Sequence, residues 1–189
     1  MKVNMTGKII FVVFLAGFLG FSPLYGADVR NTHIDINLII DGSAALEGVM
    51  SEVTAWISGS LVDQLLLPGD RITIWSAGGT AKVIYSETLQ NDAARETVKK
   101  ALQSLSASGS AADFSGALRE AAARRPIGDI SYTLLVSASS AALSPTLLGP
   151  QSNLMRFSRI EEFRGWRALV IGLNLDSKVK RAAADYFRS

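Results

Sequence analysis

Short oxygen-bearing side chains occur in three separate segments of this chain. The first is Asp41-Gly42-Ser43, the second runs from Ser110 to Asp113, and the third is Ser137-Ala138-Ser139. Carboxylate and hydroxyl oxygens are the ligands that a hard cation such as Mg²⁺ prefers, in a near-octahedral shell that usually keeps several waters. The three segments therefore form one candidate binding site, if the fold brings them together.

Catalytic constellations are nearly absent from the sequence. His33 is the single histidine, and it precedes the first expected strand, at the end of the sheet away from the three segments. A Ser-His-Asp triad would have to use it. The chain has no Gly-x-Ser-x-Gly elbow, no Gly-x-x-x-x-Gly-Lys phosphate loop and no Gly-x-Gly-x-x-Gly fingerprint. We therefore expect no catalytic residues and no enzyme. A hydrolase that uses a serine or aspartate of the same loops remains as one alternative.

The N-terminal segment has the features of a secretory signal peptide. Lys2 and Lys8 precede an unbroken apolar run over residues 9–21, and the small residues Gly26 and Ala27 follow. The run is shorter than the roughly 20 residues that span a bilayer. We expect residues 1–27 to be a signal peptide and residues 28–189 to form one domain. The alternative is an uncleaved anchor over residues 9–27, which would be the only contact with a membrane.

Charge and cysteine content limit the partners and the compartment. The chain has 19 basic and 17 acidic residues, and two of the basic ones lie in residues 1–27, which leaves the remainder formally neutral. A neutral domain without a basic face is not expected to bind nucleic acid. The chain contains no cysteine, which excludes disulfides and Cys-ligated zinc. An exported protein without disulfides suits a periplasmic or secreted location.

Hydrophobic periodicity predicts strands that alternate with helices. Residues 34–40 form an apolar strand, and Leu46, Val49, Met50, Val53 and Ile57 recur at helical spacing. Further strands are expected at residues 71–76, 82–87, 132–136 and 166–172. Further helices are expected after a cap at Asn91 or Asp92, from Asp113 to Ala123, around residues 153–163, and after a cap at Asp176. A loop containing Pro145, Gly149 and Pro150 is expected before residue 153.

This alternation predicts an α/β fold. We expect a doubly wound, mainly parallel central sheet with helices on both faces and one antiparallel edge strand, the last supplied by a hairpin around residues 77–80. In such sheets, binding sites form at the carboxyl ends of the strands, near the point where the strand order reverses. The loops at residues 41–45, 109–113 and 137–140 all leave strands or enter helices at that end.

The three segments resemble the metal-ion-dependent adhesion site of von Willebrand factor A (VWA) domains. That site consists of Asp-x-Ser-x-Ser after the first strand, a Thr in a Gly-rich loop, and an Asp after the fourth strand. Here Asp41 and Ser43 match, and Asp113-Phe114-Ser115-Gly116-Ala117-Leu118 is similar to the family sequence that follows the threonine. Alanine occupies the other three positions, at Ala45, Ala112 and Ala138. The resemblance thus implies a VWA-like fold with a degenerate adhesion site.

The substitutions predict weak or absent metal binding. Asp41 and Ser43 would supply one charge and one neutral oxygen, too little to hold a dication against its hydration. We expect no metal and no cofactor. If Mg²⁺ or Mn²⁺ binds at all, the ligands would be Asp41, Ser43 and Asp113. The structural alternatives are that Asp113 caps a helix and that the Asp41 carboxylate accepts N–H bonds from the loops beside it.

The sequence therefore predicts an exported, non-catalytic, metal-independent protein-binding module. The expected partner is another envelope or secreted protein, and the candidate contact residues are Asp41, Ser43, Ser110, Asp113, Ser137 and Ser139. The alternative within the same family is an adhesion-type domain that depends on Mg²⁺ or Mn²⁺.

Overall fold

A computed structural model describes residues 30, 32–124, 127–128, 130–148, 166–172, 177–178 and 181. The expected signal peptide, the helix expected around residues 153–163 and the cap expected at Asp176 lie outside these ranges. Within them, no helix combines the length and the hydropathy needed to cross a membrane.

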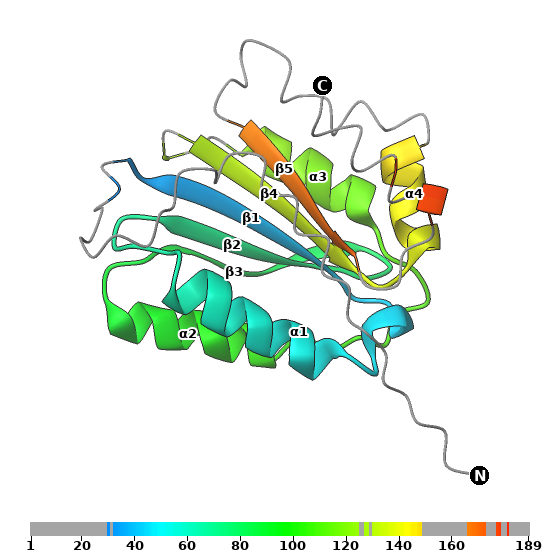
Figure 1. The fold of residues 1–189 in the computed structure, drawn as a ribbon, viewed down its shortest axis with the longest axis horizontal. Helices are drawn as coiled ribbons and strands as arrows, with labels where there is room; N and C mark the ends of the chain where they lie inside the picture. The colour runs from blue at the N-terminus through cyan, green and yellow to red at the C-terminus, as the bar shows by residue number, and fades with distance from the viewer. Residues whose placement is uncertain are drawn as a thin grey trace.

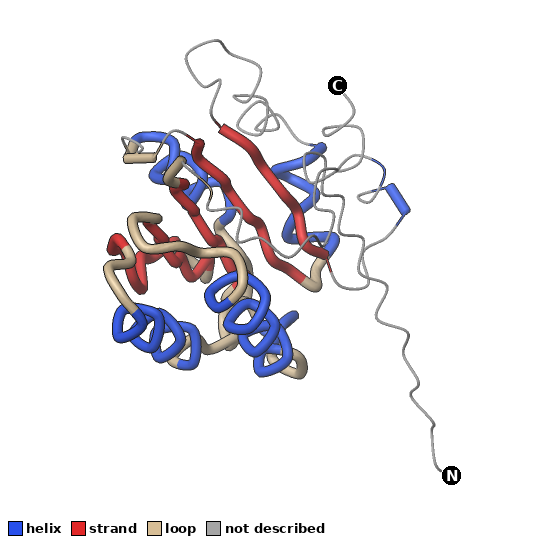
Figure 2. The backbone as a smooth tube through the Cα atoms, turned by 60° about the vertical axis from the view of Figure 1, so that its left-hand side comes forward, coloured by secondary structure: helices blue, strands red, loops and turns tan. Residues whose placement is uncertain are grey.

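The fold is a five-stranded sheet with helices on both faces (Figures 1 and 2). Its strands lie in the order β3-β2-β1-β4-β5. Strand β1 pairs in parallel with β2 and β4, β4 pairs in parallel with β5, and β3 is the antiparallel edge strand. The strands are β1 (Ile34–Asp41), β2 (Arg71–Ala77), β3 (Ala81–Thr88), β4 (Ile130–Ser137) and β5 (Trp166–Gly172). The α/β class, the parallel sheet and the antiparallel edge strand are as predicted.

The helices divide between the two faces of the sheet. They are α1 (Met50–Trp56), α2 (Asp92–Gln103), α3 (Phe114–Ala123) and α4 (Ser140–Leu148), with a 3-10 turn η1 (Ala44–Leu46) and a π-helical segment η2 (Ile57–Asp63). Helices α1 and α2 cover one face, and α3 and α4 cover the other (Figure 1). Every residue of β1 is buried, because the central strand is covered on both faces.

Each face has its own apolar core. On the α1 and α2 face, Ile36, Leu38 and Ile40 of β1 pack against side chains such as Ile57 and Val98. On the α3 and α4 face, Ile39 and Trp75 pack against Phe114 and Leu143. Burial of such side chains contributes roughly 1.5 to 3 kcal/mol each, so the two clusters are the main source of stability.

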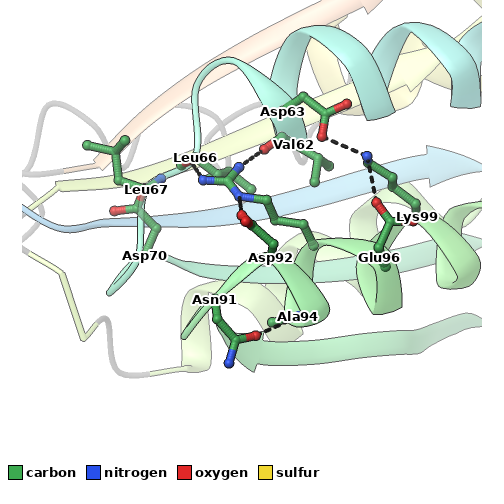
Figure 3. A network of polar contacts seen from close by, with 11 residues as sticks. Val62, Asp63, Leu66, Leu67, Asp70, Asn91, Asp92, Ala94, Glu96 and Lys99 are labelled. Atoms are coloured by element: carbon green, nitrogen blue, oxygen red, sulfur yellow. Dashed lines mark hydrogen bonds and ion pairs between the residues drawn. The ribbon is translucent and has the colours of Figure 1, made fainter. Parts of the chain in front are cut away.

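Polar contacts hold α2 against η2 (Figure 3). Lys99 on α2 pairs with Asp63 at the end of η2 at 2.8 Å and with Glu96 at 2.9 Å. The Asn91 side chain accepts the Ala94 N–H at 3.1 Å and caps α2, which settles the choice left open between Asn91 and Asp92. Arg95 donates to the backbone carbonyls of Val62 and Leu66, where the η2 segment ends.

Two predictions about the helices were inexact. Residues 140–148 form helix α4, so the prediction of a loop containing Pro145 was wrong. Ser139 initiates α4, since its hydroxyl accepts the Ala142 N–H at 3.1 Å and its carbonyl accepts the Leu143 N–H. Pro145 lacks only one donor and does not prevent the helix. The helix expected over Leu46 to Ile57 is divided into η1 and α1, and it continues into η2.

Candidate functional site

The site begins where β1 and β4 end side by side. These neighbouring strands lie at the point where the strand order reverses, because the chain passes from β1 to β2 on one side and from β4 to β5 on the other. Asp41 ends β1 and Ser137 ends β4. The Ser137 hydroxyl donates to Asp41 Oδ2, with 2.5 Å between the oxygens, and neither residue exposes any surface. The two strand ends are thus joined by a buried side-chain hydrogen bond.

The same two side chains shape the loops that leave the strands. Asp41 Oδ1 accepts the Ser43 N–H at 2.8 Å, and the Ser43 hydroxyl accepts the Ala45 N–H at 3.4 Å. On the other strand, Ser137 Oγ accepts the Ser139 N–H at 2.9 Å. Such local side-chain to backbone bonds are typical of aspartate and serine in turns. Both oxygens of the Asp41 carboxylate therefore have partners within the protein.

The Gly-rich segment joins the site through its backbone. Gly109 accepts the Ala44 N–H at 2.9 Å and donates its own N–H to the Gly42 carbonyl at 2.9 Å. A Cβ atom at Gly109 would stand 3.0 Å from that carbonyl oxygen. Glycine is needed here because the two backbones approach closely. The structure thus brings the three predicted segments together at one end of the sheet.

A fourth loop, which was not among the predicted site segments, completes the site. This loop is the turn between β2 and β3. The Gly78 carbonyl in this turn accepts a hydrogen bond from the Asp113 N–H at 3.0 Å. A Cβ atom at Gly42 would stand 2.9 Å from Ser76 Oγ and 3.1 Å from Gly78 N. This turn has few oxygen-bearing side chains, so its residue types do not mark it as part of a binding site. The parallel pairing of β1 and β2 was the available signal, since it places both carboxyl ends together.

Asp113 acts as the N-terminal cap of α3. Its Oδ1 accepts the Gly116 N–H at 2.8 Å, as the structural alternative for this residue predicted. A Cβ atom at Gly116 would stand 2.1 Å from Asp113 Oδ2, so a side chain at this position would displace the capping carboxylate. Asp113 is therefore directed at its own helix.

We call the four loops, residues 41–45, 78–80, 109–113 and 137–140, the loop rim. Asp41, Ser43 and Ser137 are buried beneath it, whereas Ser110 is exposed and Asp113 and Ser139 are half-buried. The exposed surface also includes Ala44, Ala45 and Ala111. The rim contains no lysine or arginine. The outer surface of the rim consequently consists of small side chains and carries little charge.

The side chains of the rim do not fit the ligand shell of a hard cation. Asp41 and Ser43 are the two positions that match an adhesion site. The Asp41 carboxylate accepts hydrogen bonds from Ser43 N–H and Ser137 O–H, and the Ser43 hydroxyl accepts one from Ala45 N–H. Ala45, Ala112 and Ala138 offer no side-chain oxygen at the remaining positions. Within the described ranges there is also no group of three or more His, Cys, Asp or Glu side chains that could hold a metal ion. A six-coordinate shell would have to consist largely of water.

No family model matches this sequence. No curated protein matches it either. Several solved structures do resemble its fold. The von Willebrand factor type A structure from Catenulispora acidiphila is 18% identical with a TM-score of 0.55, over 82% of this chain and 37% of that one. The conserved hypothetical protein BatB from Bacteroides thetaiotaomicron is 12% identical with a TM-score of 0.58, over 82% of this chain and 87% of that one.

The PilB minor pilin from Streptococcus sanguinis is similar as well. It is 12% identical with a TM-score of 0.55, and the match covers 84% of this chain and 55% of the pilin. This chain thus spans little more than a third of the Catenulispora protein and about half of the pilin. The strand order, the two helical layers and these likenesses together identify the fold of this chain as that of a VWA domain.

Proposed function

We propose that this chain is a non-catalytic protein-binding module that engages its partner through the loop rim without a metal ion. The observation that carries the proposal is the state of the Asp41 carboxylate. It is fully buried, and its two oxygens accept hydrogen bonds from Ser43 and Ser137. The bond from Ser137 joins the end of β4 to the end of β1, so in this proposal the two loops need no bound cation to link them.

The exposed chemistry of the rim suits contact with another protein. Ala44, Ala45 and Ala111 allow close approach of a partner backbone, and the exposed Ser110 and half-buried Ser139 offer hydroxyl groups for hydrogen bonds. Asp41, Ser43 and Ser137 expose almost no surface, so in this proposal they hold the loops in place and do not touch the partner. Interfaces of this kind gain their affinity from shape complementarity and excluded water more than from charge.

Location and partner class complete the proposal. We propose that the chain is exported to the periplasm or the cell exterior, and that its partner is another envelope or secreted protein. The basic and apolar N-terminal sequence supports export, and a likeness to the fold of a minor pilin is compatible with a surface assembly. Retention of residues 9–27 as an anchor is the alternative.

A substitution in the rim tests this proposal. Ala111→Arg places a long cation on an exposed part of the rim, and Ala123→Arg makes the same exchange on an exposed position at the other end of α3. Partners are captured by cross-linking in the native cell and quantified in EDTA and in Mg²⁺. We expect wild type and Ala123→Arg to retain the same partner equally in both buffers, and Ala111→Arg to lose it. Loss of wild-type binding in EDTA, or equal capture by both variants, would contradict the proposal.

A further inference from the structure

Strand β3 is the edge of the sheet and presents apolar side chains to solvent. Val83 is 37% exposed and Ile84 is 38% exposed, and they are two of the three large apolar side chains exposed in the described part of the chain. The strand pairs with β2 on one side, and among the described residues no strand pairs with it on the other side. An unpaired edge that carries exposed β-branched residues is a template for pairing with another strand.

A bulge in β3 places Lys82 and Glu87 at equal distances along the ladder on either side of Tyr85. Tyr85 lies opposite Ile74 of β2 and Val83 lies opposite Trp75, so Ile84 is the extra residue. Beyond the bulge, Lys82 lies opposite Ser76, and at the other end Glu87 lies opposite Ile72. Ser76 and Ile72 are each two residues from Ile74. Lys82 and Glu87 are therefore each two ladder steps from Tyr85, in opposite directions.

The same register places the three side chains on one face. Residues two steps apart in a ladder share a face of the sheet, and Tyr85 packs against the core under α1 and α2. Lys82 and Glu87 are both exposed on that side. In a regular strand without the bulge, Ile84 would take part in the ladder, the number of steps between Lys82 and Glu87 would be odd, and the two side chains would lie on opposite faces.

We propose that two copies of this chain pair through antiparallel β3 strands, about a two-fold axis at Tyr85. In such a pair, a residue two steps before Tyr85 in one copy lies opposite the residue two steps after Tyr85 in the other copy. Lys82 of each copy then lies opposite Glu87 of the other, which makes two cross-strand ion pairs. Val83 and Ile84 lose their solvent exposure against the second strand.

We expect the strand that pairs with β3 to come from a second copy of this chain, because Lys82 and Glu87 make the charge pattern of the edge self-complementary. Opposite charges directly across an antiparallel pair stabilise it, and like charges destabilise it. The interface of one strand pair is small, and small interfaces are typical of weak, transient complexes, so we expect the dimer to form only at high protein concentration. The loop rim lies at the carboxyl end of the strands and stays open in both copies, which makes the dimer bivalent toward a partner of the rim.

Charge reversal tests the pairing directly. The full chain is studied by sedimentation velocity over a range of concentrations, in a mild detergent that keeps the apolar N-terminal run from causing association. Lys82→Glu and Glu87→Lys each replace two attractive pairs with two repulsive ones, and we expect each to weaken the dimer at least about tenfold. Lys100→Glu and Glu120→Lys are matched reversals at exposed helix positions, and we expect them to leave it unchanged.

A mixture of the two variants is the decisive measurement. In a heterodimer of Lys82→Glu with Glu87→Lys, both cross-strand pairs are again attractive, and so the mixture is expected to dimerise as wild type does. The double variant Lys82→Glu/Glu87→Lys is expected to recover self-association. A wild-type protein that stays monomeric up to several hundred micromolar would overturn the proposal. A mixture that associates no better than its components would overturn it as well.

Discussion

The Ser137 hydroxyl and the Asp41 carboxylate meet at 2.5 Å across the boundary between β4 and β1. Both side chains are fully buried, and each also fixes the first turn of the loop that follows its own strand. A single buried contact thus links two loops that are far apart in the sequence.

Removal of either member of the pair should destabilise the protein. Asp41→Ala leaves the Ser43 N–H and the Ser137 hydroxyl without an acceptor, and we expect a loss of about 2 to 4 kcal/mol in the free energy of unfolding. Ser137→Ala leaves one carboxylate oxygen of Asp41 without its donor and the Ser139 N–H without its acceptor, and it should cost about 1 to 3 kcal/mol. Ser110→Ala, at an exposed serine of the rim, should change it by less than about 0.5 kcal/mol.

Urea denaturation of these variants and of the double variant measures the coupling. Because the two side chains share one hydrogen bond, the double variant should lose less than the sum of the two single losses. Strict additivity would show that the contact contributes nothing, and the account of how the loops are held would fail.

Two glycine to alanine exchanges should have opposite effects. At Gly116 a methyl group would displace the Asp113 carboxylate that caps α3, and the lost cap costs about 0.5 to 2 kcal/mol. At Gly59 in η2 a Cβ atom would meet nothing within 4 Å. There, alanine should stabilise by about 0.5 to 1 kcal/mol, because it restricts the unfolded chain and favours a helical backbone. Thermal unfolding of both variants would refute this argument if the two melting temperatures moved in the same direction.

Tyr85 should titrate above the ordinary range of tyrosine. Burial raises the pKa of its hydroxyl, and the charge of Glu87 and the hydrogen bond to it raise this pKa further. A pKa raised by folding gives stability that is complete below the unfolded value of about 10 and is lost as pH rises through the folded value. Glu87→Gln should lower the pKa of Tyr85 without restoring the ordinary value. Tyrosinate absorbance, assigned by comparison with Tyr85→Phe, measures the shift, and an unchanged titration would exclude a role for Glu87.

Much of the fold was predictable because local signals and the global arrangement agree. The apolar run that became β1 is buried along its whole length, as a central parallel strand requires. The helix from Phe114 to Ala123 begins at the expected cap, Asp113. Helix α4 was not predictable from the local sequence, because Pro145 is typical of a loop. The cap at Ser139 and the buried side chain of Leu143 outweigh the one backbone donor that the proline lacks.

The site was predictable only in outline. The parallel order of strands placed three loops together, but the contact of Ser137 with Asp41 depends on the register of β4 against β1, which no local pattern specifies. The bulge at Ile84 is likewise a property of the β2 and β3 ladder. The turn at Gly78 joins the rim through its backbone carbonyl, a group that every residue has and that a search by side-chain type does not detect.

Thermal unfolding in EDTA and in millimolar Mg²⁺ or Mn²⁺ tests most directly whether the rim is held by its own hydrogen bonds. The triple variant Ala45→Ser, Ala112→Thr, Ala138→Asp, which supplies the oxygens that the wild type lacks, serves as the positive control. A ligand at a hundred times its dissociation constant stabilises a protein by about 2.7 kcal/mol, which is readily measured. We predict that the wild-type melting temperature is the same in all buffers and that only the triple variant gains stability with the cation. A wild-type melting temperature that rises with Mg²⁺ or Mn²⁺ and falls in EDTA would contradict this account.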